Sequence, residues 1–367
     1  MNMSSQKVRY AAVLIFILLK IGSARVGAQP RVTAIFAFGD SLVDNGNNNF
    51  LRSIAKANYF PYGIDFTRGR ATGRFTNGNT LIDMFAQLLG TLSPMPFADP
   101  RTVGTRLLGG VNYASAAAGI LEESGRHYGE RFTLSQQVIN FQSTLTQMQG
   151  LMTRGNLSTY LAKSIAVLVF GSNDYINNYL MAPAYNSSFN YKPPDFANLL
   201  LYRYALHILA LRRMGLRKFV ILGLGPLGCI PNQLARGIAP AGRCVDPINQ
   251  ILGTFNEGLR RMVTQYNRNH PGSIFVYVNI YAIMGDMLNN PSTYGFSVIN
   301  RACCGLGRNQ GEITCLAGLF PCLNRSQYLF WDGLHPTQAA TVVIARRAFY
   351  GPPNDCYPIN VQQMALL

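Results

Sequence analysis

Residues 32–42 read VTAIFAFGDSL. The first seven are apolar or β-branched without a polar alternation, which is typical of a parallel strand buried on both faces. Gly39-Asp40-Ser41-Leu42 follows at once, a turn sequence that can also begin a helix. Polar residues that follow a parallel strand lie at the sheet edge where binding sites form. Ser41 is therefore the first candidate functional residue.

The rest of the chain repeats this alternation of strand and helix. Four more β-branched runs predict strands, at residues 111–114, 165–170, 219–222 and 274–278. Helical patterns between them begin near Asn79, Ser135, Asp195 and Asp246, and a final helix is expected from about 337 to 350. The alternation implies a parallel sheet with helices on both faces. No linker, charge block or repeat divides the chain, which predicts one α/β domain over residues 29–367.

The N-terminus has the layout of a secretory signal peptide. Lys7 and Arg9 precede the apolar residues 11–19, and small residues end at Ala28, after which we expect cleavage. A membrane anchor is the rival interpretation, but nine apolar residues fall short of the roughly 20 that span a bilayer. We therefore predict a secreted, extracellular protein without stable membrane insertion.

Seven cysteines are expected to be mostly paired in an oxidising compartment, with one left over. Cys229 and Cys244 flank a short Pro/Gly-containing segment and are the expected local bridge. The others can be joined in several ways: Cys303, Cys304, Cys315, Cys322 and Cys356. A zinc site is the rival, but no Cys-x-x-Cys and no histidine at ligand spacing is present, so no metal is expected.

Three sequons would accept N-linked glycans in a secreted protein, at Asn156, Asn186 and Asn324. The net charge is +16, and loss of the four basic residues of the signal leaves 16 − 4 = +12. Nucleic-acid binding predicts clustered Lys/Arg with interleaved aromatic residues, whereas the longest basic runs are dyads such as Arg212-Arg213. The charge indicates instead a surface attracted to anionic polymers or anionic interfaces outside the cell.

A serine nucleophile needs a base, and the chain offers four histidines. The positions of His127, His207 and His270 are explained by a structural role at the surface, in the core or as a helix cap. His335 lies in the loop FWDGLHP, residues 330–336, three residues after Asp332 and just before the last helix. That spacing lets the carboxylate hold one imidazole nitrogen while the other faces the serine, although Asp332 could merely cap the turn before Pro336.

Acyl transfer also needs hydrogen-bond donors for the oxyanion. Asn173 follows the third predicted strand in GSND, and Gly119 ends the stretch NYASAAAG at residues 112–119. Singly, each could be an ordinary turn residue. The chain has neither a Gly-x-Ser-x-Gly elbow nor Gly-Asp-Ser-Gly-Gly, which argues against the usual α/β-hydrolase and chymotrypsin-type enzymes.

Taken together, these segments resemble the GDSL esterase/lipase family, the SGNH hydrolases, and especially its plant branch. The similar stretches are FGDSLVDNGNN at 38–48, GRATGRFTNG at 69–78, NYAS at 112–115, FGSNDY at 170–175, GLGPLGCIP at 223–231 and YLFWDGLHPT at 328–337. The resemblance implies a flavodoxin-like three-layer α/β/α fold without metal or organic cofactor. It also implies a catalytic triad of Ser41, Asp332 and His335, and an oxyanion hole of Ser41, Gly119 and Asn173, with Gly110 a poorer match than Gly119.

The predicted function is hydrolysis of a carboxylic ester through an acyl-Ser41 intermediate. Lipid esters, cutin-like polyesters and acetylated polysaccharides all suit this chemistry, so the substrate stays open. An extracellular acyltransferase would carry the same residues. A non-catalytic acyl-glycan-binding protein on a retired hydrolase scaffold is disfavoured because Ser41, Asp332 and His335 are all present.

Overall fold

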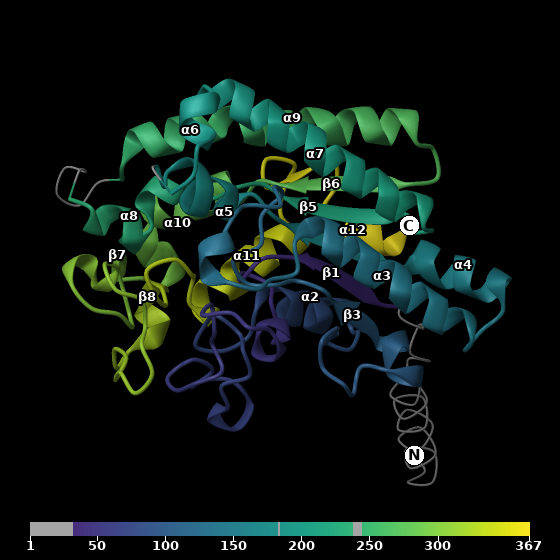
Figure 1. Ribbon diagram of the computed structural model, residues 1–367, viewed down its shortest axis with the longest axis horizontal. Coiled ribbons are helices and arrows are strands. Elements are labelled where there is room, and N and C mark those ends of the chain that lie inside the picture. The colour runs from purple at the N-terminus through teal and green to yellow at the C-terminus, as the bar shows by residue number, and fades with distance from the viewer. Residues whose placement is uncertain (1–31, 183, 238–243) are drawn as a thin grey trace, which may run out of the picture. The chain divides into compact units, whose positions relative to one another are not determined.

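A seven-stranded sheet forms the centre of the computed structural model, which describes residues 32–182, 184–237 and 244–367 (Figure 1). Its strands are β1 (Ile35–Gly39), β2 (Met95–Pro96), β3 (Gly110–Asn112), β4 (Ile165–Val169), β5 (Lys218–Leu222), β6 (Ile274–Val278) and β9 (Cys356–Tyr357). The order is β2-β3-β1-β4-β5-β6-β9, and only β9 pairs antiparallel. The central order β3-β1-β4-β5-β6 is that of flavodoxin-like folds, in which ligands bind where the order reverses, between β1 and β4.

The strands β1, β4 and β5 are buried along their whole length, as expected for strands covered by helices on both faces. β1 lies between β3 and β4, and its register pairs Ala37 with Val167 and Gly39 with Val169. The carboxyl ends of β1 and β4 therefore meet at one edge of the sheet. The residues that follow them, beginning at Asp40 and Phe170, must lie close together.

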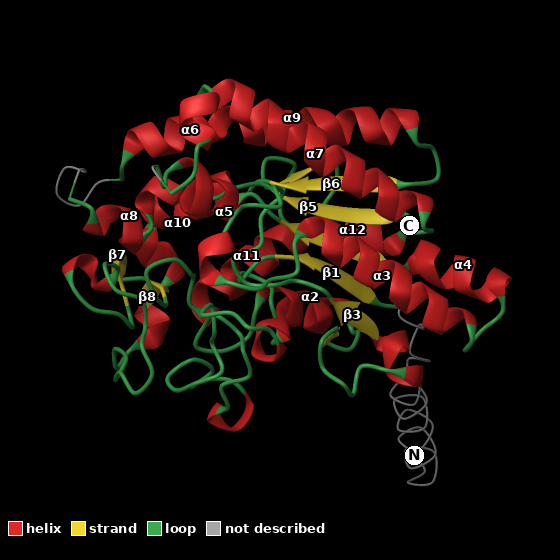
Figure 2. Cartoon of the chain, in the orientation of Figure 1, coloured by secondary structure: helices red, strands yellow, loops and turns green. Residues whose placement is uncertain are grey.

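Two packed groups of helices flank the sheet, which gives the predicted three-layer α/β/α architecture (Figure 2). One group comprises α3 (Leu134–Gln149), α4 (Arg154–Lys163), α7 (Pro193–Arg213) and α9 (Asp246–Asn269). The other comprises α2 (Leu81–Leu89), α10 (Ile280–Asn289), α11 (Gln338–Tyr350) and α12 (Val361–Leu366). Short helices lie in the connections: α5 (Ser172–Asp174), α6 (Ser187–Asn190) and α8 (Pro231–Ala235).

Helix starts differ slightly from the sequence prediction. The cap of α2 is Thr80 and not Asn79, because the Thr80 hydroxyl accepts the Asp83 N–H and the Asp83 carboxylate accepts the Thr80 N–H. Thr133 similarly caps α3 two residues before Ser135, and α7 begins at Pro193 rather than Asp195. Threonine, like serine and asparagine, is a favoured N-cap residue, so the polar residues near the starts of α2 and α3 offered more than one candidate cap.

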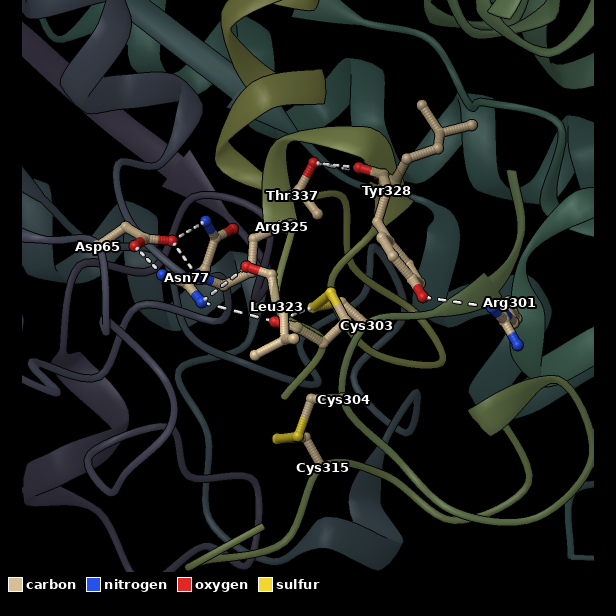
Figure 3. Close-up of a disulfide and its surroundings, with 12 residues drawn as sticks. Asp65, Asn77, Arg301, Cys303, Cys304, Cys315, Leu323, Arg325, Tyr328 and Thr337 are labelled. Atoms are coloured by element: carbon tan, nitrogen blue, oxygen red, sulfur yellow. Dashed lines mark hydrogen bonds and ion pairs between the residues drawn. A yellow bond between two sulfur atoms is a disulfide. The ribbon is translucent and has the colours of Figure 1, made fainter. Parts of the chain in front are cut away.

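Three disulfides stabilise the loops at the edge of the sheet. The predicted bridge Cys229–Cys244 is confirmed, and Cys303–Cys322 and Cys304–Cys315 complete the set, with buried Cys356 unpaired. Figure 3 shows the latter two bridges side by side, with Arg325 nearby forming a double ion pair with Asp65.

These bridges matter because their loop is hydrogen-bonded to the segment that carries Asp332. The N–H groups of Cys303 and Cys304 donate to the carbonyls of Phe330 and Trp331. This segment begins as β8 (Tyr328–Phe330), which pairs with β7 (Val298–Ala302) in a second, small sheet. The tethered loop thus positions the residues just before Asp332.

Candidate active site

The turn that carries Ser41 is held tightly at the end of β1. A Cβ at Gly39 would lie 2.5 Å from the Val43 side chain and 2.8 Å from the Val169 carbonyl oxygen, so the position needs glycine. The side chain of buried Gln137 in α3 accepts the Gly39 N–H and donates to the Gly39 carbonyl. Helix α3 thereby fixes the backbone directly before Ser41.

Ser41, His335 and Asp332 form one continuous hydrogen-bonded chain. The Ser41 Oγ lies 2.7 Å from the His335 Nε2, and the His335 Nδ1 lies 2.8 Å from both carboxylate oxygens of Asp332. Asp332 is fully buried and His335 is 6% exposed. The arrangement has the order nucleophile, base, orienting carboxylate that activates a serine hydroxyl.

The Asp332 carboxylate is kept ionised by its neighbours. Burial alone would raise its pKa, but His335, the Tyr62 hydroxyl and the Leu334 N–H stabilise the charge, and the pKa lies below its usual 3.8. Tyr62 donates to Asp332 at 2.7 Å, and the backbone N–H groups of Leu334 and His335 each donate at 2.9 Å. Tyr62 is far away in sequence and was not among the predicted site residues.

Replacing Tyr62 by phenylalanine should lower kcat at least about tenfold, since a hydrogen bond to a charged group is worth about 1.5 to 3 kcal/mol net. Loss of this donor raises the pKa of Asp332, so the carboxylate becomes protonated at a higher pH. The acid limb of the kcat profile should therefore move to higher pH. Tyr59→Phe is the matched control, because the Tyr59 hydroxyl donates to the Cys315 carbonyl instead. If the acid limbs of the kcat profiles of Tyr62→Phe and wild type coincide, Tyr62 has a packing role only.

Asn173 lies in α5, a few residues after the end of β4. Its side-chain amide donates to the Ala118 carbonyl at 2.9 Å, and its carbonyl oxygen accepts the Asn177 amide at 2.6 Å. These two bonds fix which way the amide points. The side-chain amide of Asn173 has a second N–H besides the one that donates to Ala118. Asn173 also lines both of the cavities that Ser41 lines.

Gly119 is placed differently. It lines neither cavity, and a Cβ there would lie 2.5 Å from Ser124 and 2.6 Å from Asp174, so its small size serves packing. Ala117 does line a cavity with Ser41, and its φ of +67° is rare for a residue with a Cβ. No sequence pattern marked Ala117 as a site residue, since the left-handed conformation is usually taken by glycine. Gly110 begins β3, where an added Cβ would lie 2.1 Å from the Ile35 carbonyl oxygen.

Three further buried carboxylic acids surround the site. Burial raises the pKa of Asp40 to about 7 and those of Asp44 and Asp174 to about 6, although hydrogen bonds to each act in the opposite direction. Asp44 accepts the N–H groups of Gly46, Asn47 and Ala116, which joins the loop after Ser41 to the loop of Ala117.

Asp174 likewise accepts the N–H groups of Ile120 and Leu121. The acids at positions 44 and 174 thus hold together the loops on which Ser41, Ala117 and Asn173 lie. The sequence signal for this role was present, since both acids lie within polar runs after predicted strands.

Two cavities open from Ser41 and His335. The first has a volume of about 970 Å³, including the open space at its mouth. It is lined mainly by aliphatic side chains from the ends of the strands and from α10 and α11. The second measures about 550 Å³ and is lined by Tyr59, Tyr62, Tyr128, Lys56 and other residues of the loops.

Other predicted residues lie away from this centre. The sequon residues Asn156, Asn186 and Asn324 are all exposed. His127 pairs with the Tyr185 hydroxyl, at 2.7 Å. Within residues 32–182, 184–237 and 244–367, no group of three or more His, Cys, Asp or Glu side chains is placed to hold a metal ion. The predicted signal peptide lies outside the described residues.

Sequence comparison relates this chain to known proteins. The sequence profile described as GDSL-like Lipase/Acylhydrolase matches residues 35–348. The chain is 62% identical to GDSL esterase/lipase At1g71250 of Arabidopsis thaliana, over 93% of this chain and 91% of that protein. It is 51% identical to GDSL esterase/lipase At5g08460 of the same plant, over 91% and 88% of the two chains. A third Arabidopsis thaliana relative, GDSL esterase/lipase At1g29670, is 48% identical over the full length of both.

Proposed function

This chain belongs to the GDSL-like lipase/acylhydrolase family and is a carboxylic ester hydrolase, and we propose that it acts through an acyl-Ser41 intermediate. The observation that carries the mechanism is the 2.7 Å contact between the Ser41 hydroxyl and the His335 Nε2, with buried Asp332 on the other imidazole nitrogen. No cofactor takes part in the proposed mechanism.

In the first half-reaction the Ser41 Oγ attacks the ester carbonyl carbon while His335 Nε2 accepts the serine proton. The tetrahedral intermediate collapses as His335 returns that proton to the leaving alcohol oxygen, which leaves the acyl group on Ser41. In the second half-reaction His335 deprotonates water, which attacks the acyl carbon, and the carboxylic acid and Ser41 hydroxyl are released. Asp332 orients His335 and stabilises its charged form throughout.

The oxyanion is held in this proposal by the Ser41 N–H, the Asn173 side-chain amide and a backbone N–H of the 116–119 loop. Gly119 remains a prediction for the third donor, but the geometry favours Ala117, which lines the cavity beside Ser41 where Gly119 does not. Ala117 also has a φ of +67°, a conformation that is rare for a residue with a Cβ.

Replacing Asn173 by alanine should lower kcat by about 10² to 10³ with a smaller change in KM, because the amide acts on charge that develops in the transition state. Steady-state kinetics on p-nitrophenyl butyrate measures both constants. Asn177→Ala is the comparison, since the Asn177 side-chain amide donates to the carbonyl oxygen of the Asn173 side chain. An Asn173 variant that changes only KM would assign this residue to substrate binding.

The overall activity is tested with p-nitrophenyl esters from acetate to palmitate and with a fluorophosphonate probe that labels activated serines. Turnover and labelling at Ser41 support the proposal. Labelling with transfer of the acyl group to an added alcohol in preference to water would favour the acyltransferase alternative. Absence of both would favour the non-catalytic acyl-glycan-binding alternative.

The protein is proposed to be secreted to the cell wall or apoplast. The N-terminal layout of Lys7, Arg9 and the apolar run after them supports this location, as do three disulfides and three exposed sequons. The basic surplus would attract it to anionic wall polymers. Separately, none of the helices in the described residues is long and apolar enough to cross a bilayer.

A further inference from the structure

We propose that the acyl chain of the substrate occupies the first cavity and the alcohol occupies the second, so that this enzyme prefers esters of medium- or long-chain fatty acids over acetate esters. This inference rests on the proposed nucleophilic role of Ser41. It depends on how differently the two cavities are lined on either side of the same Ser41–His335 pair.

The first cavity is suited to a hydrocarbon chain. Its polar side chains, Asp40, Ser41, Ser172, Asn173, His335 and Thr341, come mostly from the loops after β1 and β4 and from the His335 loop. The remaining lining side chains are apolar and include Leu224, Ile280, Met284 and Ile344, which are all buried. A fully polar substituent such as a sugar would lose its hydrogen bonds to water there without replacement.

A glycine keeps this cavity open beside α10. A Cβ at Gly225 would lie 2.8 Å from the Met284 Sδ and 3.4 Å from the Ile280 side chain. Both of those residues lie on α10, with Met284 one turn after Ile280. Met284 is unbranched and flexible, so its side chain can adapt to a chain that enters the cavity.

The second cavity has more aromatic and polar groups than the first. Tyr59, Tyr62 and Tyr128 line it together with Asn177 and Thr314, beside apolar side chains that include Ile54, Phe75 and Leu334. Lys56 also lines it and donates to the backbone carbonyls of Asn48, Asn49 and Leu51, and no ion pair joins Lys56 to a carboxylate in the described part of the chain. The hydroxyls of Tyr59 and Tyr62 already donate to the Cys315 carbonyl and to Asp332, so these rings offer a substrate mainly their faces, which suit an aromatic alcohol better than an alkyl chain.

The size of the effect follows from hydrophobic transfer. Each methylene that leaves water for an apolar site should raise kcat/KM about fourfold until the cavity is filled. On this basis the butyrate ester should exceed the acetate ester by about 16-fold, and octanoate should exceed butyrate. A shallow acetyl site would give the opposite trend.

The decisive experiment compares ethyl octanoate with octyl acetate, which are isomers with the long chain on the acyl or the alcohol side. Ethyl acetate is the reference substrate. We expect the wild type to prefer ethyl octanoate by at least tenfold in kcat/KM. In the Met284→Trp variant, the ratio of ethyl octanoate to ethyl acetate should fall at least tenfold, because the indole fills the cavity. The same change should leave the ratio of octyl acetate to ethyl acetate within about twofold.

Ile139→Trp is the matched control, because Ile139 is exposed on α3 and lines neither cavity. If Met284→Trp does not fold, Met284→Ala decides, since a larger cavity should move the optimum acyl chain from octanoate to a longer acid. A fall confined to octyl acetate would overturn the assignment of the two cavities. Unchanged ratios in both Met284 variants would overturn it as well.

Failure of this inference can be told apart from failure of the proposed function. If Ser41→Ala abolishes ethyl acetate hydrolysis while chain length has no effect, the mechanism stands and the acyl cavity assignment falls. If Ser41→Ala hydrolyses every ester at the wild-type rate, Ser41 is not the nucleophile.

Discussion

Ser41→Ala is expected to lower kcat on p-nitrophenyl butyrate by about 10⁴ to 10⁶, the range found when a serine nucleophile is removed from a hydrolase triad. The reason is chemical, since no other hydroxyl contacts the His335 Nε2 in the described structure. Ser41 is only half-buried and lies in a turn, so its loss removes no core packing. The thermal unfolding midpoint should therefore stay within a few degrees of wild type.

The control for this substitution is Ser143→Ala, on the exposed face of α3. It changes the same atoms at a site without hydrogen bonds to His335 or Asp332. Residual turnover of Ser41→Ala should be insensitive to a fluorophosphonate inhibitor. Turnover near the wild-type rate, still blocked by that inhibitor, would show that a different serine is acylated.

Asp332→Asn is expected to lower kcat by about 10⁴ while KM changes little. An amide at this position cannot accept all the donors that now converge on it: His335 Nδ1, the Tyr62 hydroxyl and the N–H groups of Leu334 and His335. If the amide oxygen accepts the backbone N–H groups, its NH₂ faces His335 and holds the imidazole in the tautomer that cannot accept the serine proton.

Stability should also fall in this variant, because a buried donor facing another donor costs about 1 to 3 kcal/mol. Chemical unfolding monitored by fluorescence would measure that loss beside the kinetic one. Asp195→Asn at the exposed start of α7 is the control for removing one negative charge. A kcat within tenfold of wild type would mean that His335 is oriented by other groups and that Asp332 is structural.

The features of this protein that could be predicted are those that depend on residues close together in the sequence. Five apolar runs predicted β1, β3, β4, β5 and β6 within a few residues, because burial on both faces leaves an uninterrupted apolar signal. The strands β2 and β9, each two residues long, were missed because so short an element has no periodicity to recognise. Only Cys229–Cys244 among the disulfides was foreseen, since each of the other five cysteines had several possible partners.

The candidate triad was accessible to sequence reasoning because Ser41 follows a strand directly and Asp332 and His335 share one loop. Tyr62 was not accessible, since 270 residues separate it from Asp332 and no local pattern marks its hydroxyl as a partner. Ala117 was missed for a related reason: its left-handed backbone is imposed by surrounding contacts and runs against the preference of alanine.

The linear sequence alone determined the fold class, the family resemblance and which residues can carry the chemistry. It could do so because strand burial and motif spacing depend on residues that are neighbours along the chain. The distances that join Ser41 to His335, the donors to Asp332 and the two unlike cavities were set only by the tertiary structure. Each of these arises where segments hundreds of residues apart are packed against one sheet edge, and packing depends on the shapes of all the side chains that meet there.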